Sequence, residues 1–600
     1  MEHLVSLLRK NKLLAAALVV ELAVVVWLAA GLFGPAYRLS LTPDAFSNDF
    51  PGFAALTEDG SALQIYNNNG FTSDKEITFS TAGVALPSGA YEVTVDYFSC
   101  QTPDAPTFSV QQSAGSLTFA SDKVPSAVQA DTLTLDDGHR TVTTRLWVSS
   151  GARLQDLTAT LHYGEGQLYL YGIQFTEQPI YRLTRLVCFL FFFGVVDFLG
   201  WLLVACTGAQ GAARRRALRL PLALLGITVL ACLPLFSDHL YFGHDLRYHL
   251  QRITAMAAEL SYGQFPVRIA TTTLNGYGYI NPLCYCELFL LLPALLYNAW
   301  LPLRTCYQVY IFAVTLAACG FSYLCFARIS RSRRGGVLGA ALYTLSVYRL
   351  VCVYFRAAVG EYTAMSFLPL VLLGVYEIYT CEKPRFAQWA PLALGMAALV
   401  QSHLISTELT GAFLLLFCLL RLRQTLRPAR LLAWVKAALL AFGLSAWFLV
   451  PFASTALSVP LQVNEGLPGK PQSEGLTLMQ LINPFGPGFG GTTPGTSNDM
   501  SLTLGLPLVL GVALVVFCLF RRDRWELGSS LRLTAGLGVL AVVLSLQIFP
   551  WDFVESWLGF TAGKLAGTFQ YPWRFLAPAT LLLCAAALLA LQLIARHHAA

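Results

Sequence analysis

One stretch of the sequence, residues 243–268, combines a carboxylate, histidines and arginines with a helical repeat of apolar residues. Asp245 is flanked by His244, Arg247 and His249. A carboxylate beside cations can accept a proton from an attacking hydroxyl, with a pKa set by burial and by the neighbouring charges. The same carboxylate could instead cap the helix that the apolar repeat predicts from residue 246. Spacing alone favours neither role.

Further basic residues stand in segments that the charge pattern places outside the membrane. Arg356 and Glu361 precede one apolar run, Arg574 ends the stretch Gln570-Tyr-Pro-Trp-Arg574, and Lys470 lies in a long loop rich in Gly and Pro. The planar fork of arginine suits phosphate, so a lipid phosphate or diphosphate is a natural ligand. Snorkelling at the membrane surface, or an ion pair with a glutamate, is the structural alternative.

Two further patterns bear on chemistry. His403, at the end of an apolar run, could join the same site or form a hydrogen bond between helices. His244, Asp245 and His249 could share a divalent metal, since residues four apart lie on one helix face, but no spacing here is diagnostic and the metal is left unassigned. The sequence has no convincing Walker, dinucleotide-binding or nucleophile-elbow pattern, so chemistry driven by ATP is not indicated.

The composition defines the class of protein. Of the 600 residues, 55% are apolar and only 12% are charged, with a mean hydropathy of +0.56. A soluble domain carries about 25% charged residues, so this is a polytopic membrane protein. The net charge of +6 comes from basic clusters between apolar runs, which are topology signals and give no reason to expect nucleic acid. Nearly all of the 14 cysteines lie inside apolar runs, so neither disulfides nor zinc are predicted.

Residues 36–180 differ in character, because they are polar and their apolar residues alternate. Period-two patterns at 91–97, 132–135, 140–148 and 167–171 are separated by turn-rich gaps. Several short strands in such a segment predict a β-sandwich. Its pattern is similar to that of a jelly-roll carbohydrate-binding module, although aromatic residues in strands can equally belong to the core.

The remaining chain contains a series of apolar runs. Thirteen are found, counting the first at 13–33, and the basic clusters fall on one side only if the run at 283–299 does not cross. We therefore predict about twelve transmembrane helices and one re-entrant or interfacial segment, in a bacterial plasma membrane. The expected organisation is a cytoplasmic N-terminus with an anchor (1–35), an extracytoplasmic β-sandwich (36–180) and a transmembrane domain (181–600) with outer loops 237–304, 453–500 and 549–574.

A family resemblance covers residues 218 to about 595. It is carried by Gly243-His-Asp245, by the helix that ends at Arg268, by Asn281-Pro-Leu283, by Tyr348-Arg-Leu350 and by the stretch from Arg356 to Glu361. This order resembles the bacterial GT-C superfamily of polytopic glycosyltransferases. More narrowly, it looks like the Firmicutes membrane proteins labelled as related to 6-pyruvoyl-tetrahydropterin synthase, which are similar to the membrane family that glycosylates lipoteichoic acid.

The resemblance implies a GT-C-like fold, an undecaprenyl-phosphate sugar as donor, and transfer outside the cytoplasm with inversion. It implies that Asp245 is the general base or a metal-linked catalyst, and that Arg574 holds the donor phosphate. The sequence departs from many members of the superfamily in one respect: the residue before Asp245 is His244 and not a second acid.

The resulting hypothesis is a glycosyltransferase that moves a sugar from a polyprenyl phosphate to a cell-envelope glycan or teichoic acid, with Asp245 as catalytic residue. The candidates for binding donor phosphate or substrate are His244, Arg247, His249, Arg356, Glu361, His403, Lys470 and Arg574. The expected partners are the lipid-linked sugar, the glycan acceptor and the bilayer. Two alternatives stay open: a transporter or flippase of lipid-linked saccharides, and a scaffold that binds envelope glycans without catalysis.

Overall fold

The computed structural model describes residues 12–47, 54–66, 78–100, 113–120, 130–135, 137–148, 154–164, 166–207, 211–237, 240–274, 277–459, 471–482, 500, 502–521, 528–559 and 568–599. The chain divides into two compact units, Met1–Gly211 and Ala212–Ala600.

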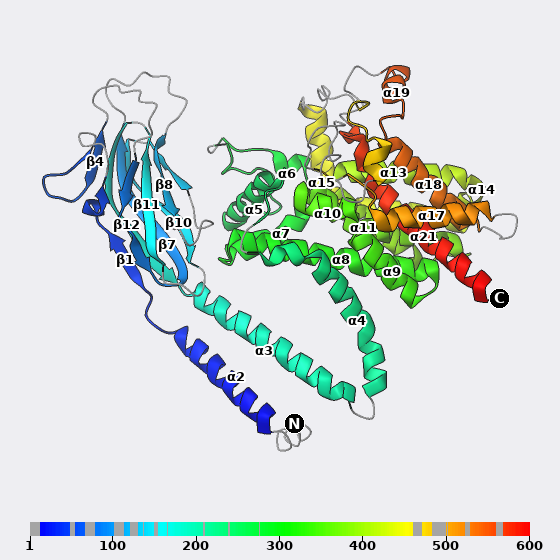
Figure 1. Ribbon diagram of the computed structural model, residues 1–600. Helices are drawn as coiled ribbons and strands as arrows, with labels where there is room; N and C mark the ends of the chain where they lie inside the picture. The colour runs from blue at the N-terminus through cyan, green and yellow to red at the C-terminus, as the bar shows by residue number, and fades with distance from the viewer. Residues whose placement is uncertain are drawn as a thin grey trace. The chain divides into compact units, whose positions relative to one another are not determined.

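The first unit is a two-sheet β domain with a helix on each side of it in sequence. Helix α2 (Lys12–Gly31) leads into the domain and α3 (Ile180–Thr207) leaves it, and the two helices run side by side (Figure 1). One sheet has the order β10-β7-β12-β4-β3, with β1 also pairing with β12. The other has the order β2-β5-β11-β8-β9, with β6 also pairing with β11. The strands are β1 (Arg38–Leu41), β2 (Phe46–Ser47), β3 (Ala54–Leu56), β4 (Leu63–Tyr66), β5 (Thr78–Thr81), β6 (Val84–Leu86), β7 (Gly89–Cys100), β8 (Ser113–Ala120), β9 (Ala130–Thr134), β10 (Gly138–Val148), β11 (Leu154–Tyr163) and β12 (Gln167–Gln178).

Alternating side chains build the core of this domain. Along β7, Val93, Val95 and Tyr97 are buried and the residues between them face outward. All four segments with period-two patterns lie on strands, β7, β9, β10 and β12, so the predicted β-sandwich is confirmed. A bulge in β12 between Leu170 and Gly172 inserts one extra residue opposite β7.

The second unit is built of helices. They are α4 (Gly211–Ala231), η3 (Leu233–Phe236), α5 (Leu246–Ser261), α6 (Asn281–Cys284), η4 (Leu288–Leu290), α7 (Leu291–Asn298), α8 (Leu303–Ser330), α9 (Arg333–Thr344), α10 (Val347–Leu350), η5 (Val351–Phe355), α11 (Val359–Thr380), α12 (Phe386–Val400), α13 (Leu404–Leu420), α14 (Leu422–Thr425), α15 (Pro428–Ser458), α16 (Leu478–Ile482), α17 (Leu506–Phe520), α18 (Ser529–Ser545), α19 (Trp551–Trp557), η7 (Pro572–Phe575) and α21 (Leu576–Ala599).

The apolar helices of this unit include several with the length of a membrane span. Among the described residues, four helices are long and apolar enough to cross: Leu303–Ser330, Val359–Thr380, Pro428–Ser458 and Pro572–His597. A fifth is present if Arg333–Thr344 and Val347–Phe355, bent by 47°, form one broken span. The predicted total of twelve spans and the side that each helix end faces stay predictions. The predicted re-entrant segment 283–299 forms short pieces, and α7, with 8 residues, is only about 12 Å long at 1.5 Å per residue.

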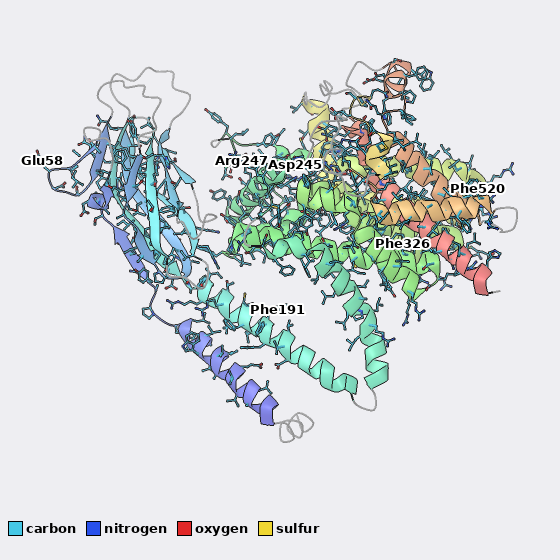
Figure 2. The ribbon with its side chains drawn as sticks, in the orientation of Figure 1. Glu58, Phe191, Asp245, Arg247, Phe326 and Phe520 are labelled. Atoms are coloured by element: carbon cyan, nitrogen blue, oxygen red, sulfur yellow. The ribbon has the colours of Figure 1, made fainter. Side chains whose placement is uncertain are left out.

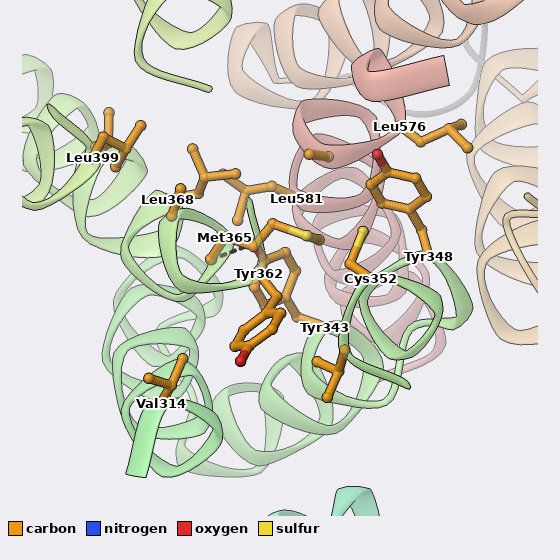
Figure 3. Packing of buried hydrophobic residues seen from close by; sticks show 14 of the residues in the cluster. Val314, Tyr343, Tyr348, Cys352, Tyr362, Met365, Leu368, Leu399, Leu576 and Leu581 are labelled. Carbon is orange, nitrogen blue, oxygen red and sulfur yellow. Dashed lines mark hydrogen bonds between the residues drawn. The ribbon is translucent and has the colours of Figure 1, made fainter. Parts of the chain in front are cut away.

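Helix α11 lies at the centre of the apolar packing. It packs against α8 and α12, and Figure 3 shows its residues Tyr362, Met365 and Leu368 inside the buried cluster. The hydroxyl of Tyr343 on α9 donates a hydrogen bond of 2.7 Å to the carbonyl of Met365. Tyr348 lies at the side of the cluster formed by Leu576, the first residue of α21 (Figure 3). The segments that carry Tyr348 and Arg574 are thereby fixed to one core.

The close approach of α11 and α12 gives a test of this packing. A Cβ atom built on Gly374 would lie 2.3 Å from the backbone nitrogen of Leu392, whereas one on Gly320 of α8 would have no atom within 4 Å. We expect Gly374→Ala to lower the melting temperature of the purified protein, because overpacking costs about 1–3 kcal/mol. Gly320→Ala is the matched control and should leave it unchanged or higher. Equal melting temperatures of the two variants would contradict the observed helix contact.

Candidate functional site

A short backbone pairing positions Asp245. The amide of His244 donates to the carbonyl of Phe355 at 3.2 Å, and the amide of Asp245 donates to the carbonyl of Arg356 at 2.9 Å. Only glycine fits at position 243, since a Cβ there would lie 2.6 Å from the Cβ of Ala357. The segment before α5 is therefore held against the connection between η5 and α11. Figure 2 labels Asp245 and Arg247 at the same end of α5.

Next to this pairing lies a buried ion pair. Arg356 Nη1 is 2.7 Å from Glu361 Oε2, and the hydroxyl of Tyr348 donates to Glu361 Oε1. The Arg356 guanidinium lies over the ring of Trp573, 4.3 Å from its centroid. Ala357 has a φ of 50°, a conformation that costs energy for a residue with a side chain and recurs at functional sites.

Arg574 reaches the same glutamate from η7. Its Nη1 donates to His403 Nε2 at 3.1 Å and its Nη2 donates to Gln570 Oε1 at 2.5 Å. Its Nε is 4.0 Å from Glu361 Oε2, too far for a hydrogen bond. Arg356, Glu361, His403, Trp573 and Arg574 are called the Glu361 cluster below. In the described part of the chain, Arg574 Nε and Trp573 Nε1 are buried donors without an acceptor.

His403 joins η7 to the start of α13. Arginine can only donate, so His403 Nε2 accepts from Arg574. The other ring nitrogen, Nδ1, lies 2.8 Å from the hydroxyl oxygen of Ser406 and 3.3 Å from the backbone nitrogen of Ser406, at the N-terminus of α13. His403 therefore holds one nitrogen of Arg574 in place.

A second buried group lies beside the first. Arg252 of α5 forms an ion pair with Glu287 at 2.9 Å, lies 4.0 Å from the centroid of the Tyr285 ring, and contacts His249 Nδ1 at 3.2 Å. The rings of Tyr285 and His403 are 6.2 Å apart. A Cβ on Gly360 would lie 1.9 Å from the Tyr285 hydroxyl oxygen. Tyr285 thus packs between this ion pair and the Glu361 cluster.

The carboxylate of Asp245 remains open to solvent at the edge of the cluster. Its side chain does not cap α5, although Asp245 is the residue before the helix. The net pKa of Asp245 is raised, chiefly because surrounding protein atoms remove part of its hydration. The charges of Arg356, Arg574 and His244 act against this and lower the pKa. The charge of Glu361 raises it. Asp245 therefore lies within electrostatic reach of both arginines.

The predicted site residues separate into groups. The structure brings together Asp245, Arg356, Glu361, His403 and Arg574. His244 is exposed beside Asp245, and His249 belongs to the second buried group. Arg247 is exposed on the first turn of α5 and, within the described part of the chain, does not contact the Glu361 cluster. Lys470 lies outside the described residues.

Several residues of the site do not stand out in the sequence. Tyr348 and Trp573 stand inside motifs that resemble the superfamily, but their aromatic side chains suggest core packing. Tyr285 and Gln570 carry no signal of their own. Glu287 does carry one, because an acid inside an apolar run needs a partner. Over the residues that the structure describes, no group of three or more His, Cys, Asp or Glu could hold a metal. The possible divalent metal stays unassigned.

Comparisons with known proteins give distant similarities. No protein-family model matches the chain. An uncharacterized protein of Lactococcus lactis subsp. cremoris is 27% identical over 239 residues, which is 38% of this chain and 38% of that protein. The chain thus matches little more than a third of this relative.

Among solved structures, ArnT from Cupriavidus metallidurans, bound to undecaprenyl phosphate, is similar over 64% of this chain and 60% of its own, with 14% identity and a TM-score of 0.38. The C-terminal CBM6 of LamC from Zobellia galactanivorans is similar over 24% of this chain and 100% of its own, with 15% identity and a TM-score of 0.17. Both TM-scores are below 0.5, so these similarities are distant.

The shared glutamate gives a direct test of the cluster. Glu361→Gln leaves Arg356 and Arg574 buried without a carboxylate, and breaking a buried pair in this way costs about 3–5 kcal/mol. We expect a clear loss in the melting temperature of the purified protein. Glu382→Gln is the matched control, because Glu382 is exposed in the connection between α11 and α12 and a surface change of this kind is usually worth less than about 0.5 kcal/mol. Equal losses in both variants would contradict the role of Glu361.

Proposed function

We propose that the chain is an inverting glycosyltransferase that moves a sugar from a polyprenyl phosphate to a hydroxyl of a cell-envelope glycan or teichoic acid, outside the cytoplasm. One observation carries the proposal. A carboxylate open to solvent, Asp245, is held by the backbone beside two arginines, and one of these, Arg574, keeps a buried donor without an acceptor.

The Glu361 cluster is suited to bind the phosphate. Its two arginines share one carboxylate, so one positive charge is left over within the cluster. A phosphate oxygen would supply an acceptor for Arg574 Nε and Trp573 Nε1, whose burial without a partner costs free energy. The leaving phosphate gains a negative charge when its bond to the sugar breaks. Fixed cations at that position stabilise the transition state more than the bound donor.

Asp245 supplies the base on the solvent side. Its carboxylate takes the proton of the acceptor hydroxyl, the hydroxyl oxygen attacks the anomeric carbon, and the bond from that carbon to the phosphate oxygen breaks. The electron pair of that bond leaves with the phosphate, and a single displacement inverts the anomeric configuration. A raised pKa makes Asp245 a stronger base than an ordinary aspartate.

Replacement of the carboxylate tests this role. Asp245→Asn should reduce sugar transfer from a labelled polyprenyl-phosphate sugar by about 10²–10⁴-fold, the usual contribution of general acid–base catalysis. Asp552→Asn, which changes an exposed acid on α19, is the control and should retain transfer. Unchanged transfer by Asp245→Asn would exclude the proposed base. Movement of intact lipid-linked sugar across proteoliposomes, without new glycosidic bonds, would favour a transporter.

The pKa of Asp245 predicts two effects of pH. Transfer needs the ionised carboxylate, so the rate should fall on acidification at a higher pH than an ordinary aspartate would give. A raised pKa also means that the folded state disfavours the charge, so Asp245→Asn should be at least as stable as the natural protein at pH 7. This difference in melting temperature should shrink as the pH falls through the raised pKa of folded Asp245. It should vanish where the carboxyl is protonated in both the folded and the unfolded chain. A flat rate profile, or a variant that is less stable at pH 7, would contradict the expectation.

One aromatic surface of the β domain favours a role for this domain in binding the glycan acceptor. On the outward face of its first sheet, Phe98 and Tyr169 form an edge contact at 5.8 Å, and the exposed Tyr171 lies 5.2 Å from the ring of His139. His139 contacts Asp96 at 2.8 Å. Aromatic rings with polar groups beside them can stack on the apolar face of a sugar and bind its hydroxyls.

We expect Tyr171→Ala to weaken binding of purified teichoic acid or envelope glycan to the full chain. The loss should be about 2–10-fold, because an aromatic contact is worth about 0.5–1.5 kcal/mol. Thr143→Ala, on the exposed part of β10, is the control. Equal binding by the natural protein and Tyr171→Ala, measured by affinity electrophoresis, would remove this surface from the proposal.

A further inference from the structure

At the base of the β domain, one arginine has all of its N–H donors occupied by hydrogen bonds within the protein. Arg182, in the first turn of α3, donates to both carboxylate oxygens of Glu177 at 3.0 and 2.6 Å. It also donates to the carbonyls of Gly31, Gly34 and Pro35 at 3.0, 2.7 and 2.7 Å. These five hydrogen bonds use the five N–H donors of a guanidinium. Arg182 therefore ties the end of α2 to the start of α3 and cannot bind a ligand as well.

One turn further along α3, Arg185 has a different environment. It lines the same recess as Arg182 and is half-buried. Within the described part of the chain it forms no hydrogen bond or ion pair. A half-buried cation that lines a cavity can bind an anion without first breaking an internal contact.

The recess is large enough for part of a lipid. It has a volume of about 390 Å³, and its apolar wall is formed by Trp27, Leu28 and Ala30 of α2, opposite Tyr181 of α3. Trp27 is 66% exposed although it is a large aromatic residue. Tryptophan and tyrosine concentrate where a membrane meets water, and arginine there binds anionic lipids.

The surfaces of α2 and α3 continue this apolar wall. Val26 on α2 is 59% exposed, and Val187 and Phe191 on α3 are 55% and 74% exposed; Figure 2 labels Phe191. Exposed apolar residues on two adjacent helices are expected where the helices contact lipid chains. The recess thus lies where these apolar helices end and the polar β domain begins.

We infer that this recess binds an anionic phospholipid, whose phosphate pairs with Arg185 and whose acyl chain lies along Trp27 and Leu28. The charge of Arg185 selects an anionic headgroup over a zwitterionic one, and the apolar wall selects a lipid over a free phosphate. This site lies within the first unit and does not depend on the proposed transfer reaction. Its function is to fix the base of the β domain to the membrane surface.

The inference is tested with the full chain in vesicles of phosphatidylcholine, with or without one quarter phosphatidylglycerol. Arg185→Gln should lower the preference for retained phosphatidylglycerol, measured by native mass spectrometry, about fivefold, as expected for one basic residue near a membrane surface. Arg38→Gln, an exposed arginine on β1 outside the recess, is the control, and Arg185→Lys should keep most of the preference. An unchanged preference in Arg185→Gln would overturn the inference.

Measurements on the natural protein complete the test in case a variant fails to fold. Phosphatidylglycerol should raise its melting temperature more than phosphatidylcholine, and inorganic phosphate should not reproduce the effect. Equal stabilisation by the two lipids would overturn the inference. Stabilisation by inorganic phosphate alone, to the same extent as by phosphatidylglycerol, would show a phosphate site and overturn the assignment of a lipid.

Discussion

The pairing of two arginines with one buried glutamate is the interaction on which the candidate site depends. Glu361 binds Arg356 at 2.7 Å and lies 4.0 Å from Arg574, although the two arginines are more than 200 positions apart. Charges in a low-dielectric interior are stable only when they are paired and hydrogen-bonded. The need to pair them holds η5, α11 and η7 together. Asp245 lies beside the Glu361 cluster because its backbone amide donates a hydrogen bond to the carbonyl of Arg356, which follows η5.

The hydrogen bonding of this cluster is incomplete. A buried donor without an acceptor costs about 1–3 kcal/mol, and a bound anion would remove that cost. Arg574 Nε and Trp573 Nε1 stay without an acceptor among the described residues, while His403 and Gln570 fix the other nitrogens of Arg574. These two contacts fix the orientation of the guanidinium. In the proposed reaction, such preorganisation would avoid the cost of rearranging charges.

The sequence predicts what depends on composition and local pattern. Alternation in β7 and β10 predicts strands because one face of each is buried, and an acid with cations at 243–249 predicts Asp245 as a candidate. Contacts made by the folded chain carry no such pattern. The strained backbone of Ala357, the contact of His403 with Arg574 and the packing of Tyr285 all depend on segments far apart in sequence. The length of an apolar run in the sequence also does not show where a helix bends. Residues 336–353 form one continuous apolar stretch in the sequence, but in the structure the helix axis bends by 47° near Ser346, the residue before α10.

A cryo-EM structure of the full chain with a polyprenyl monophosphate would test the central claim most directly, namely that Asp245 and Arg574 serve one substrate. Density for the phosphate should lie within hydrogen-bond distance of Arg574 Nε, with Asp245 on its solvent side and space for a sugar between them. Phosphate density elsewhere in the helical unit, with the Glu361 cluster unchanged and unoccupied at saturating lipid, would contradict the assignment of this cluster as the donor site.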